Sequence, residues 1–250
     1  MTTVIKKYKL LIEQYHGIER DATEKEIHDK RVTLRRIFPI LNAYKMDFSS
    51  VKNGKKSFKL FGKLRDIQVQ LLKLGTIEPT PEILEYMAYL KTSELKLKQK
   101  VRRFSEKKEL AFPMIKKNSN PNKSKVLNKA DKSLRKLITR IRSNSIDDAR
   151  DIHKIRIEFK KFRYVVEVLS YLEKIEETKL ENLKLYQDKL GEIQDYTVLI
   201  DGMTRYARKR NLDEETTLEQ FERDQDLLIV NFENGIEEFI GACREVVGMN

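Results

Sequence analysis

One pattern occurs twice in this chain: a histidine followed three and seven residues later by cationic side chains. The first copy lies in residues 26–38 and contains His28, and the second lies in residues 151–163 and contains His153. At about 100° of rotation per residue, such positions share one stripe of a helix, and apolar residues occupy the neighbouring face here. The pattern therefore predicts two equivalent amphipathic helices, each with a cationic stripe beside a buried face.

These stripes contain the first candidate binding residues. Packing has no need of cations at matching positions of two helices, because burying a charge is unfavourable. The repeated spacing therefore favours a functional role for both histidines, and a structural hydrogen bond to a neighbouring helix remains the alternative. We name the two sets the first ridge, which consists of His28, Arg31, Arg35 and Arg36, and the second ridge, which consists of His153, Arg156, Lys160, Lys161 and Arg163.

A second motif repeats in the same order along the chain. Residues 62–69 and 191–198 share the pattern Gly-x-aliphatic-x-Asp-x-x-Val, with Asp66 and Asp195 at the acidic position. Two motifs repeated in order at nearly constant spacing indicate one structural unit used twice. We interpret both aspartates as side chains that orient a cation or cap a neighbouring helix, rather than as catalytic groups.

Composition and periodicity together predict an all-α fold. Nine glycines, five prolines and 36% charged residues suit long helices better than sheets. Residues 112–122 break the helical pattern and predict a linker. We expect residues 1–250 to form one domain of two four-helix bundles, residues 1–117 and 118–250, related by internal duplication with pseudo-twofold symmetry.

Several local signals predict helix boundaries. Thr23 and Glu26 have the spacing of a capping box, so the first histidine helix should begin there. Pro39 should end or kink that helix. Asp147 or Asp148 suits the start of the second histidine helix. The last predicted helix is a single element from about residue 214 to residue 247.

The net charge of +12 predicts a polyanionic partner. Acidic residues predominate after residue 210, so the rest of the chain is more basic still. We interpret Lys107, Lys108, Lys116 and Lys117 as part of a solvated face. Cations that point away from the apolar stripe of residues 123–142, and their counterparts near the N-terminus, should extend the binding surface: Lys132, Arg135, Lys136, Lys6 and Lys9.

The chain offers little sign of secretion or membrane insertion. Cys243 is the only cysteine and cannot form an intramolecular disulfide, which favours the reducing cytoplasm. No apolar run approaches the roughly 18–20 residues of a membrane span, and the N-terminus lacks a signal-peptide pattern. We therefore expect a cytoplasmic protein that does not bind membranes.

The sequence resembles the CHAD family, the conserved-histidine α-helical domains, in two repeated features. These are residues 27–36 and 152–161, and the two Gly-x-x-x-Asp elements. The resemblance spans nearly the whole chain. It implies two four-helix bundles around a pseudo-twofold axis, with a basic surface that binds inorganic polyphosphate and a location at polyphosphate granules. It carries the binding role onto His28, Arg31, Arg35, Arg36, His153, Arg156, Lys160 and Lys161.

Three positions depart from the family pattern. Lys160 and Lys161 stand where arginines are usual, so the second ridge should supply point charges rather than forked contacts. Gln194 stands where the first half has Arg65. The two halves are therefore expected to contribute unequally. We also expect both ridges to face one polyphosphate chain, which sulfate or phosphate would mimic in crystals, and binding to tighten as the pH falls.

Two other functions are consistent with parts of the pattern. Nucleic-acid binding would need aromatic side chains among the cations, but the aromatic residues fall at core spacing and tryptophan is absent. Histidine phosphotransfer would favour a carboxylate beside each histidine, yet Asp29 corresponds to Lys154. Lys25 and Arg150 occupy the positions at which a helical di-iron site has glutamates. We expect no enzymatic activity, cofactor or metal.

Overall fold

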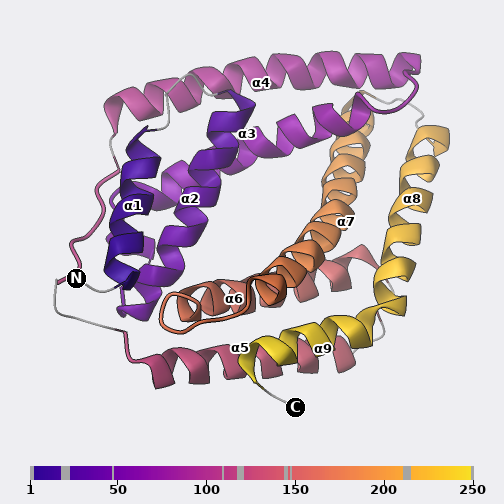
Figure 1. Ribbon diagram of the computed structural model, residues 1–250. Coiled ribbons are helices and arrows are strands. Elements are labelled where there is room, and N and C mark those ends of the chain that lie inside the picture. The colour runs from indigo at the N-terminus through magenta and orange to yellow at the C-terminus, as the bar shows by residue number, and fades with distance from the viewer. Residues whose placement is uncertain are drawn as a thin grey trace. The chain divides into compact units, whose positions relative to one another are not determined.

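The computed structural model describes residues 3–17, 23–46, 48–108, 110–116, 121–143, 146, 148–210 and 215–248. The described residues form nine α-helices and one short 3-10 helix, with no strand among them (Figure 1). The fold class is therefore all-α, as the composition predicted. The chain divides into two compact units, Met1–Pro121 and Asn122–Asn250.

The first unit consists of four α-helices and the 3-10 helix η1 (Phe48–Ser50). Figure 1 shows α1 beside α2 and α4 running along α3. Each helix buries one apolar face, and the fully buried side chains include Ile5, Leu11, Leu34 and Phe61. The four helices are α1 (Thr3–Gly17), α2 (Glu24–Ala43), α3 (Gly54–Leu74) and α4 (Pro81–Lys107).

The helix ends of the first unit follow the local signals in the sequence. Thr23 and Glu26 form the predicted capping box, in which the Thr23 side chain accepts from the Glu26 backbone and Glu26 accepts from the Thr23 backbone. Thr80 caps α4, whose first residue is Pro81. Pro39 does not end α2, which continues through it to Ala43.

Residues 110–116, which follow α4, pack into the core of the first unit. The Tyr8 hydroxyl donates to the Pro113 backbone oxygen at 2.8 Å, and Leu110 and Ile115 are buried. The Lys52 backbone N–H also donates to the Ala111 oxygen at 3.1 Å. Residues 110–116 therefore pack on the helices of the first unit, although residues 112–116 belong to the predicted linker. Lys117, in the same predicted linker, lies outside the described residues.

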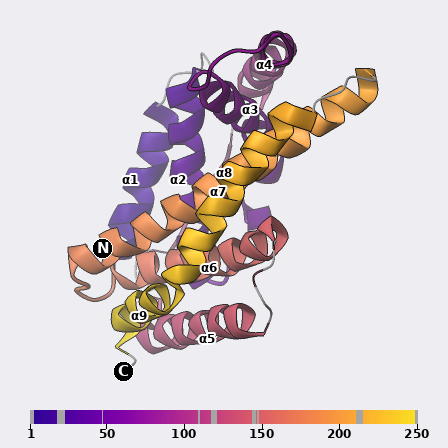
Figure 2. The same cartoon turned by 90° about the vertical axis from the view of Figure 1, so that its right-hand side faces the viewer.

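The second unit contains five α-helices. Figure 2 shows α9 beside α5 and α8 along α7. Its core combines residues of all five helices, and Phe159, Phe162 and Phe239 are fully buried. The helices are α5 (Lys123–Arg142), α6 (Ala149–Leu169), α7 (Glu177–Arg210), α8 (Glu215–Asn234) and α9 (Ile236–Val247). Asp148 caps α6 with hydrogen bonds to two backbone N–H groups, whereas Asp147 lies outside the described residues.

The prediction of one helix from residue 214 to residue 247 is wrong, because the chain turns at Gly235 between α8 and α9. Glycine weakens a helix, and the turn brings the apolar face of α9 onto the core. Phe239 then packs 4.8 Å from Phe159 and 4.9 Å from Tyr186, measured between ring centroids. The second unit therefore has one helix more than predicted, and the duplication with pseudo-twofold symmetry stays a prediction.

Within the described residues, no helix combines the length and the apolar character that crossing a membrane would require.

Candidate functional site

The first ridge lies along the solvent side of α2, beside its buried face. Ile27 and Leu34 are buried, as their spacing predicted, whereas His28 is exposed and Arg31 is half-buried. Lys30 is 7% exposed, because helical periodicity places it within the apolar stripe, between Leu41 and Ile37. The four residues of the first ridge therefore share one side of α2: His28 and Arg36 are exposed, and Arg31 and Arg35 are half-buried.

An aromatic ring of α3 supports the two central arginines. The Phe58 ring centroid lies 5.0 Å from the Arg31 Cζ and 6.0 Å from the Arg35 Cζ. The Arg31 Nη1 also donates to the Phe58 backbone oxygen at 3.4 Å. Cations are attracted to the face of an aromatic ring at such distances. Phe58 therefore orients both guanidinium groups, a role that local periodicity could not predict because Phe58 lies 27 residues from Arg31.

The glycine of the second repeated motif makes room for Arg31. A Cβ atom at Gly62 would lie 2.8 Å from Arg31 Nη1, closer than non-bonded atoms approach. Gly191, at the matching position of the other unit, would meet nothing within 4 Å. Gly62 thus allows the Arg31 guanidinium to lie close to the backbone of α3, whereas Gly191 has no such neighbour.

His28 lies in a positive environment that favours its neutral form. Partial burial lowers the pKa of His28 below its usual value, and the nearby charges of Arg65, Arg35 and Arg31 lower this pKa further. Asp29 acts in the opposite direction. Arg65 is held by an ion pair with Glu24 at 2.5 Å. Burial and the neighbouring cations therefore both favour the neutral imidazole in the free protein.

The second ridge lies on α6 and is held by amide side chains of α7. His153 Nδ1 contacts Gln194 Oε1, and Arg163 Nη1 donates to Gln187 Oε1. An amide oxygen can only accept, so the imidazole donates from Nδ1. His153 and Lys161 are exposed, whereas Arg156, Lys160 and Arg163 are half-buried. Gln194 thus contacts the histidine at the position where the first unit has Arg65.

Acidic neighbours offset part of the charge on the second ridge. Lys161 Nζ lies 2.7 Å from Glu158 Oε1, and Lys154 Nζ lies 2.8 Å from Asp151 Oδ1. Exposed pairs of this kind stabilise a helix only weakly, but they reduce the local positive potential. In the second ridge itself, Glu158 therefore offsets part of the charge of Lys161.

The remaining predicted residues lie on α1, α3, α5 and α7. On α5, Arg135 pairs with Asp131 at 3.1 Å. Asp66 is exposed and Asp195 is half-buried. The additional predicted cations all have exposed side chains: Lys6 and Lys9 on α1, and Lys132, Arg135 and Lys136 on α5.

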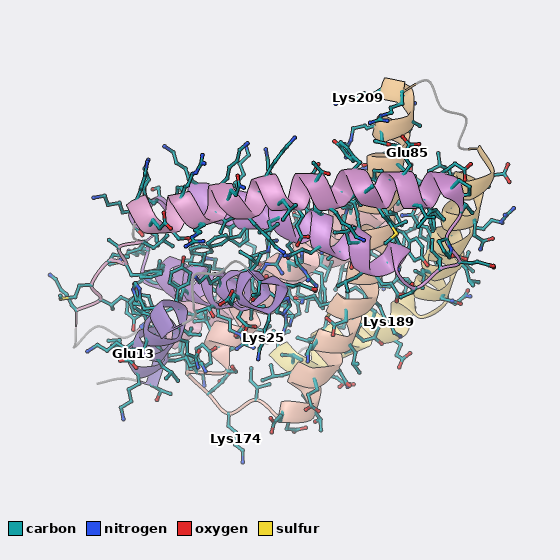
Figure 3. The ribbon with its side chains drawn as sticks, turned by 90° about the horizontal axis from the view of Figure 1, so that it is seen from above. Glu13, Lys25, Glu85, Lys174, Lys189 and Lys209 are labelled. Atoms are coloured by element: carbon teal, nitrogen blue, oxygen red, sulfur yellow. The ribbon has the colours of Figure 1, made fainter. Side chains whose placement is uncertain are left out.

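The described residues contain no group of three or more His, Cys, Asp and Glu side chains that could hold a metal ion. Lys25, three residues before His28, extends from the first turn of α2 (Figure 3). An ammonium group at this position cannot act as a metal ligand while it is protonated.

These features define a class of all-helical protein in which a helix of each unit carries an exposed histidine and a row of cations. The model of the CHAD domain family matches residues 6–203. The chain belongs to the CHAD domain family. No curated protein matches it in sequence.

Two solved structures are similar to this chain in fold. One is the crystal structure of the CHAD domain from the plant Ricinus communis, which is 13% identical, with 98% of this chain and 89% of that chain covered and a TM-score of 0.58. The other is PptA from Streptomyces chartreusis, which is 12% identical, with 94% of this chain and 97% of that chain covered and a TM-score of 0.57. At these identities the likeness concerns the fold alone.

Proposed function

We propose that this protein binds inorganic polyphosphate non-covalently through the cations of the two ridges, without catalysis. The observation that carries the proposal is the arrangement of Arg31 and Arg35, whose guanidinium groups are both oriented by Phe58. Polyphosphate is a chain of tetrahedral phosphate groups with about one negative charge each, and it has no nucleobase that a protein could recognise. Fixed guanidinium groups suit such a ligand, because each supplies several donors and loses little freedom on binding.

The histidine of the first ridge supports the same ligand class. Its pKa is lowered in the free protein, so a nearby polyanion would reverse the effect of the surrounding cations and favour the imidazolium. Binding would then be coupled to the uptake of a proton. The imidazolium would add a donor and a charge at the site of contact.

The two ridges differ in the cations that they offer to polyphosphate. The first ridge has three arginines, of which two lie against Phe58. The second ridge includes Lys160 and Lys161, and Lys161 pairs with Glu158. Arginine offers a planar fork for phosphate oxygens, whereas lysine acts as a point charge. We infer that the first ridge supplies the larger share of the affinity.

Nucleic acid is the alternative ligand, and the ring at the first ridge argues against it. Phe58 is half-buried and its ring lies beneath two guanidinium groups. A protein that binds single strands instead exposes aromatic rings on which bases stack. A competition assay between polyphosphate and single-stranded RNA at matched phosphate concentration separates the two, and a preference for RNA would overturn the proposal.

A double charge reversal tests the binding residues. Arg31→Glu with Arg156→Glu should lower the affinity for a labelled polyphosphate by about 100-fold or more, since each charge-assisted contact contributes about 1.5–3 kcal/mol. The matched control is Lys96→Glu with Lys184→Glu, because both lysines are exposed and the change in net charge is the same. Equal affinities of the two folded variants would refute the assignment.

A further inference from the structure

The first unit contains a pocket of about 800 Å³ that no residue of either ridge lines. It lies where the end of α1, the start of α3, the end of α4 and the segment from Leu110 to Phe112 meet. The backbone hydrogen bond from Lys52 to Ala111 holds two of these segments together. Pockets of about 300–1,000 Å³ suit small-molecule ligands.

One wall of the pocket is apolar and aromatic. Phe112 is half-buried, and its ring packs edge-on against Tyr15 at 5.5 Å and against His16 at 5.8 Å, measured between ring centroids. Ile12 and the buried Leu110 complete this wall. Because neighbouring rings fix Phe112, the wall offers a preformed surface for a flat apolar group.

Three lysines from separate parts of the chain also line the pocket. Lys52 precedes α3, and Lys107 and Lys108 lie at the end of α4. All three are exposed, and none forms an ion pair with a carboxylate within the part of the chain that the structure describes. Figure 3 shows further nitrogen-tipped side chains projecting from α4. Three ammonium groups therefore line the pocket, and their charge favours an anionic ligand.

The start of α3 borders the pocket as well. Asn53, which lines the pocket, precedes the helix in a left-handed conformation with φ of 63°, and its side chain makes no capping hydrogen bond. The first turn of α3 has no acidic residue, although acidic residues usually stabilise this end of a helix. The C-terminal ends of α1 and α4 also border the pocket and carry the opposite partial charge, so the positive character of the pocket comes from Lys52, Lys107 and Lys108.

We propose that this pocket is a second anion site, for a small molecule that joins a flat aromatic group to a short phosphate chain. A nucleoside di- or triphosphate has this chemistry. Its base lies against Phe112 and Ile12, and its phosphates lie among Lys52, Lys107 and Lys108. Inorganic polyphosphate has no apolar group and leaves the aromatic wall unused, so this site goes beyond the polyphosphate-binding function proposed above.

Calorimetric titration of the full chain with ATP, inorganic triphosphate and adenosine tests the proposal. ATP should bind about 10-fold more tightly than triphosphate, because stacking of the base adds to the phosphate contacts. Lys107→Glu with Lys108→Glu should weaken ATP binding by more than about 10-fold. The control, Lys96→Glu with Lys100→Glu, makes the same charge change on exposed residues of α4 and should leave ATP affinity unchanged.

Two further measurements separate this site from the ridges. Phe112→Leu keeps an apolar side chain and should bring the affinities for ATP and triphosphate together. Arg31→Glu with Arg35→Glu should weaken polyphosphate binding while ATP affinity stays unchanged. In the wild-type chain, photolabelling with 8-azido-ATP should mark a peptide that contains Phe112, so this result does not depend on the folding of any variant.

Three results would overturn the second site: no ATP binding at about 1 mM, equal affinities of the wild type for ATP and triphosphate, or loss of ATP binding in the ridge variant. A photolabel placed away from the pocket would do the same. The polyphosphate proposal is tested separately, by whether the ridge variant loses polyphosphate binding. A negative result for ATP therefore does not affect it.

Discussion

Gly62 and Arg31 are in such close contact that a methyl group on α3 would collide with the guanidinium, at 2.8 Å from Nη1. The nearest atom belongs to the end of a flexible side chain, so Arg31 can move away from an added Cβ. The glycine is therefore needed for the position of Arg31 rather than for the fold of α3.

This contact predicts opposite effects of Gly62→Ala on stability and on binding. Alanine should stabilise α3 by up to about 1 kcal/mol, because it favours the helix more than glycine does. Displacement of Arg31 should weaken polyphosphate binding by about 10-fold. Thermal unfolding and a binding titration measure the two effects.

Gly191→Ala is the control for that prediction, since a Cβ there meets nothing within 4 Å. It should stabilise α7 to a similar extent and leave polyphosphate affinity unchanged. Equal affinities of the two alanine variants would show that Arg31 has no preferred position in the complex.

The pKa of His28 predicts how binding depends on pH. This pKa is lowered in the free protein and should rise when a polyanion binds, so the complex takes up a proton and its affinity increases as the pH falls toward the lowered pKa of the free protein. One such proton changes the affinity by at most about 10-fold per pH unit. Titrations across this range in wild type and in His28→Gln measure the effect, and an unchanged slope in the variant would contradict it.

The same lowered pKa affects the stability of the free protein. The unfolded chain binds a proton at His28 more readily than the folded chain, so stability should decrease as the pH falls through about 6.5 toward the lowered pKa. His28→Gln removes this contribution. Urea unfolding at mildly acidic and neutral pH should therefore show a smaller difference in the variant than in wild type.

The unequal ridges predict unequal losses on truncation. Arg31→Ala with Arg35→Ala should weaken polyphosphate binding more than Arg156→Ala with Lys160→Ala, because only the first pair lies against Phe58. Each lost phosphate contact should also reduce the logarithmic salt dependence by about 0.7, by analogy with single strands. Titrations at several salt concentrations measure both effects, and the reverse order of affinities would contradict the assignment of the first ridge as dominant.

The turn at Gly235 predicts a stability effect on α9. Phe239→Ala should destabilise the protein by about 3–5 kcal/mol, because its side chain is fully buried against Phe159 and Tyr186. Leu227→Ala on α8 is the control, since Leu227 is 62% exposed and should change stability by less than about 0.5 kcal/mol. Similar midpoints for both variants in urea unfolding would show that α9 does not pack as described.

Local patterns were sufficient for most of the helices and for the outward position of the ridges. The capping box at Thr23 and the proline at residue 81 act within one helical turn, so their effects could be predicted. The break at Gly235 could not, because an isolated glycine is tolerated in many helices and the packing of Phe239 favours the turn here. Ile115 lies in the predicted linker, and its burial could not be predicted, because it depends on helices of the first unit that are distant in the sequence.

The amino-acid sequence by itself determined the all-helical class and the stripe of cations beside each histidine, because helical periodicity ties spacing along the chain to position around the helix. Only the tertiary structure decided that Phe58 and Gly62 position Arg31, that Gln194 contacts His153, and that Phe112 forms part of a pocket. Each of these contacts joins residues far apart in the sequence, and packing between helices rather than local periodicity brings such residues together.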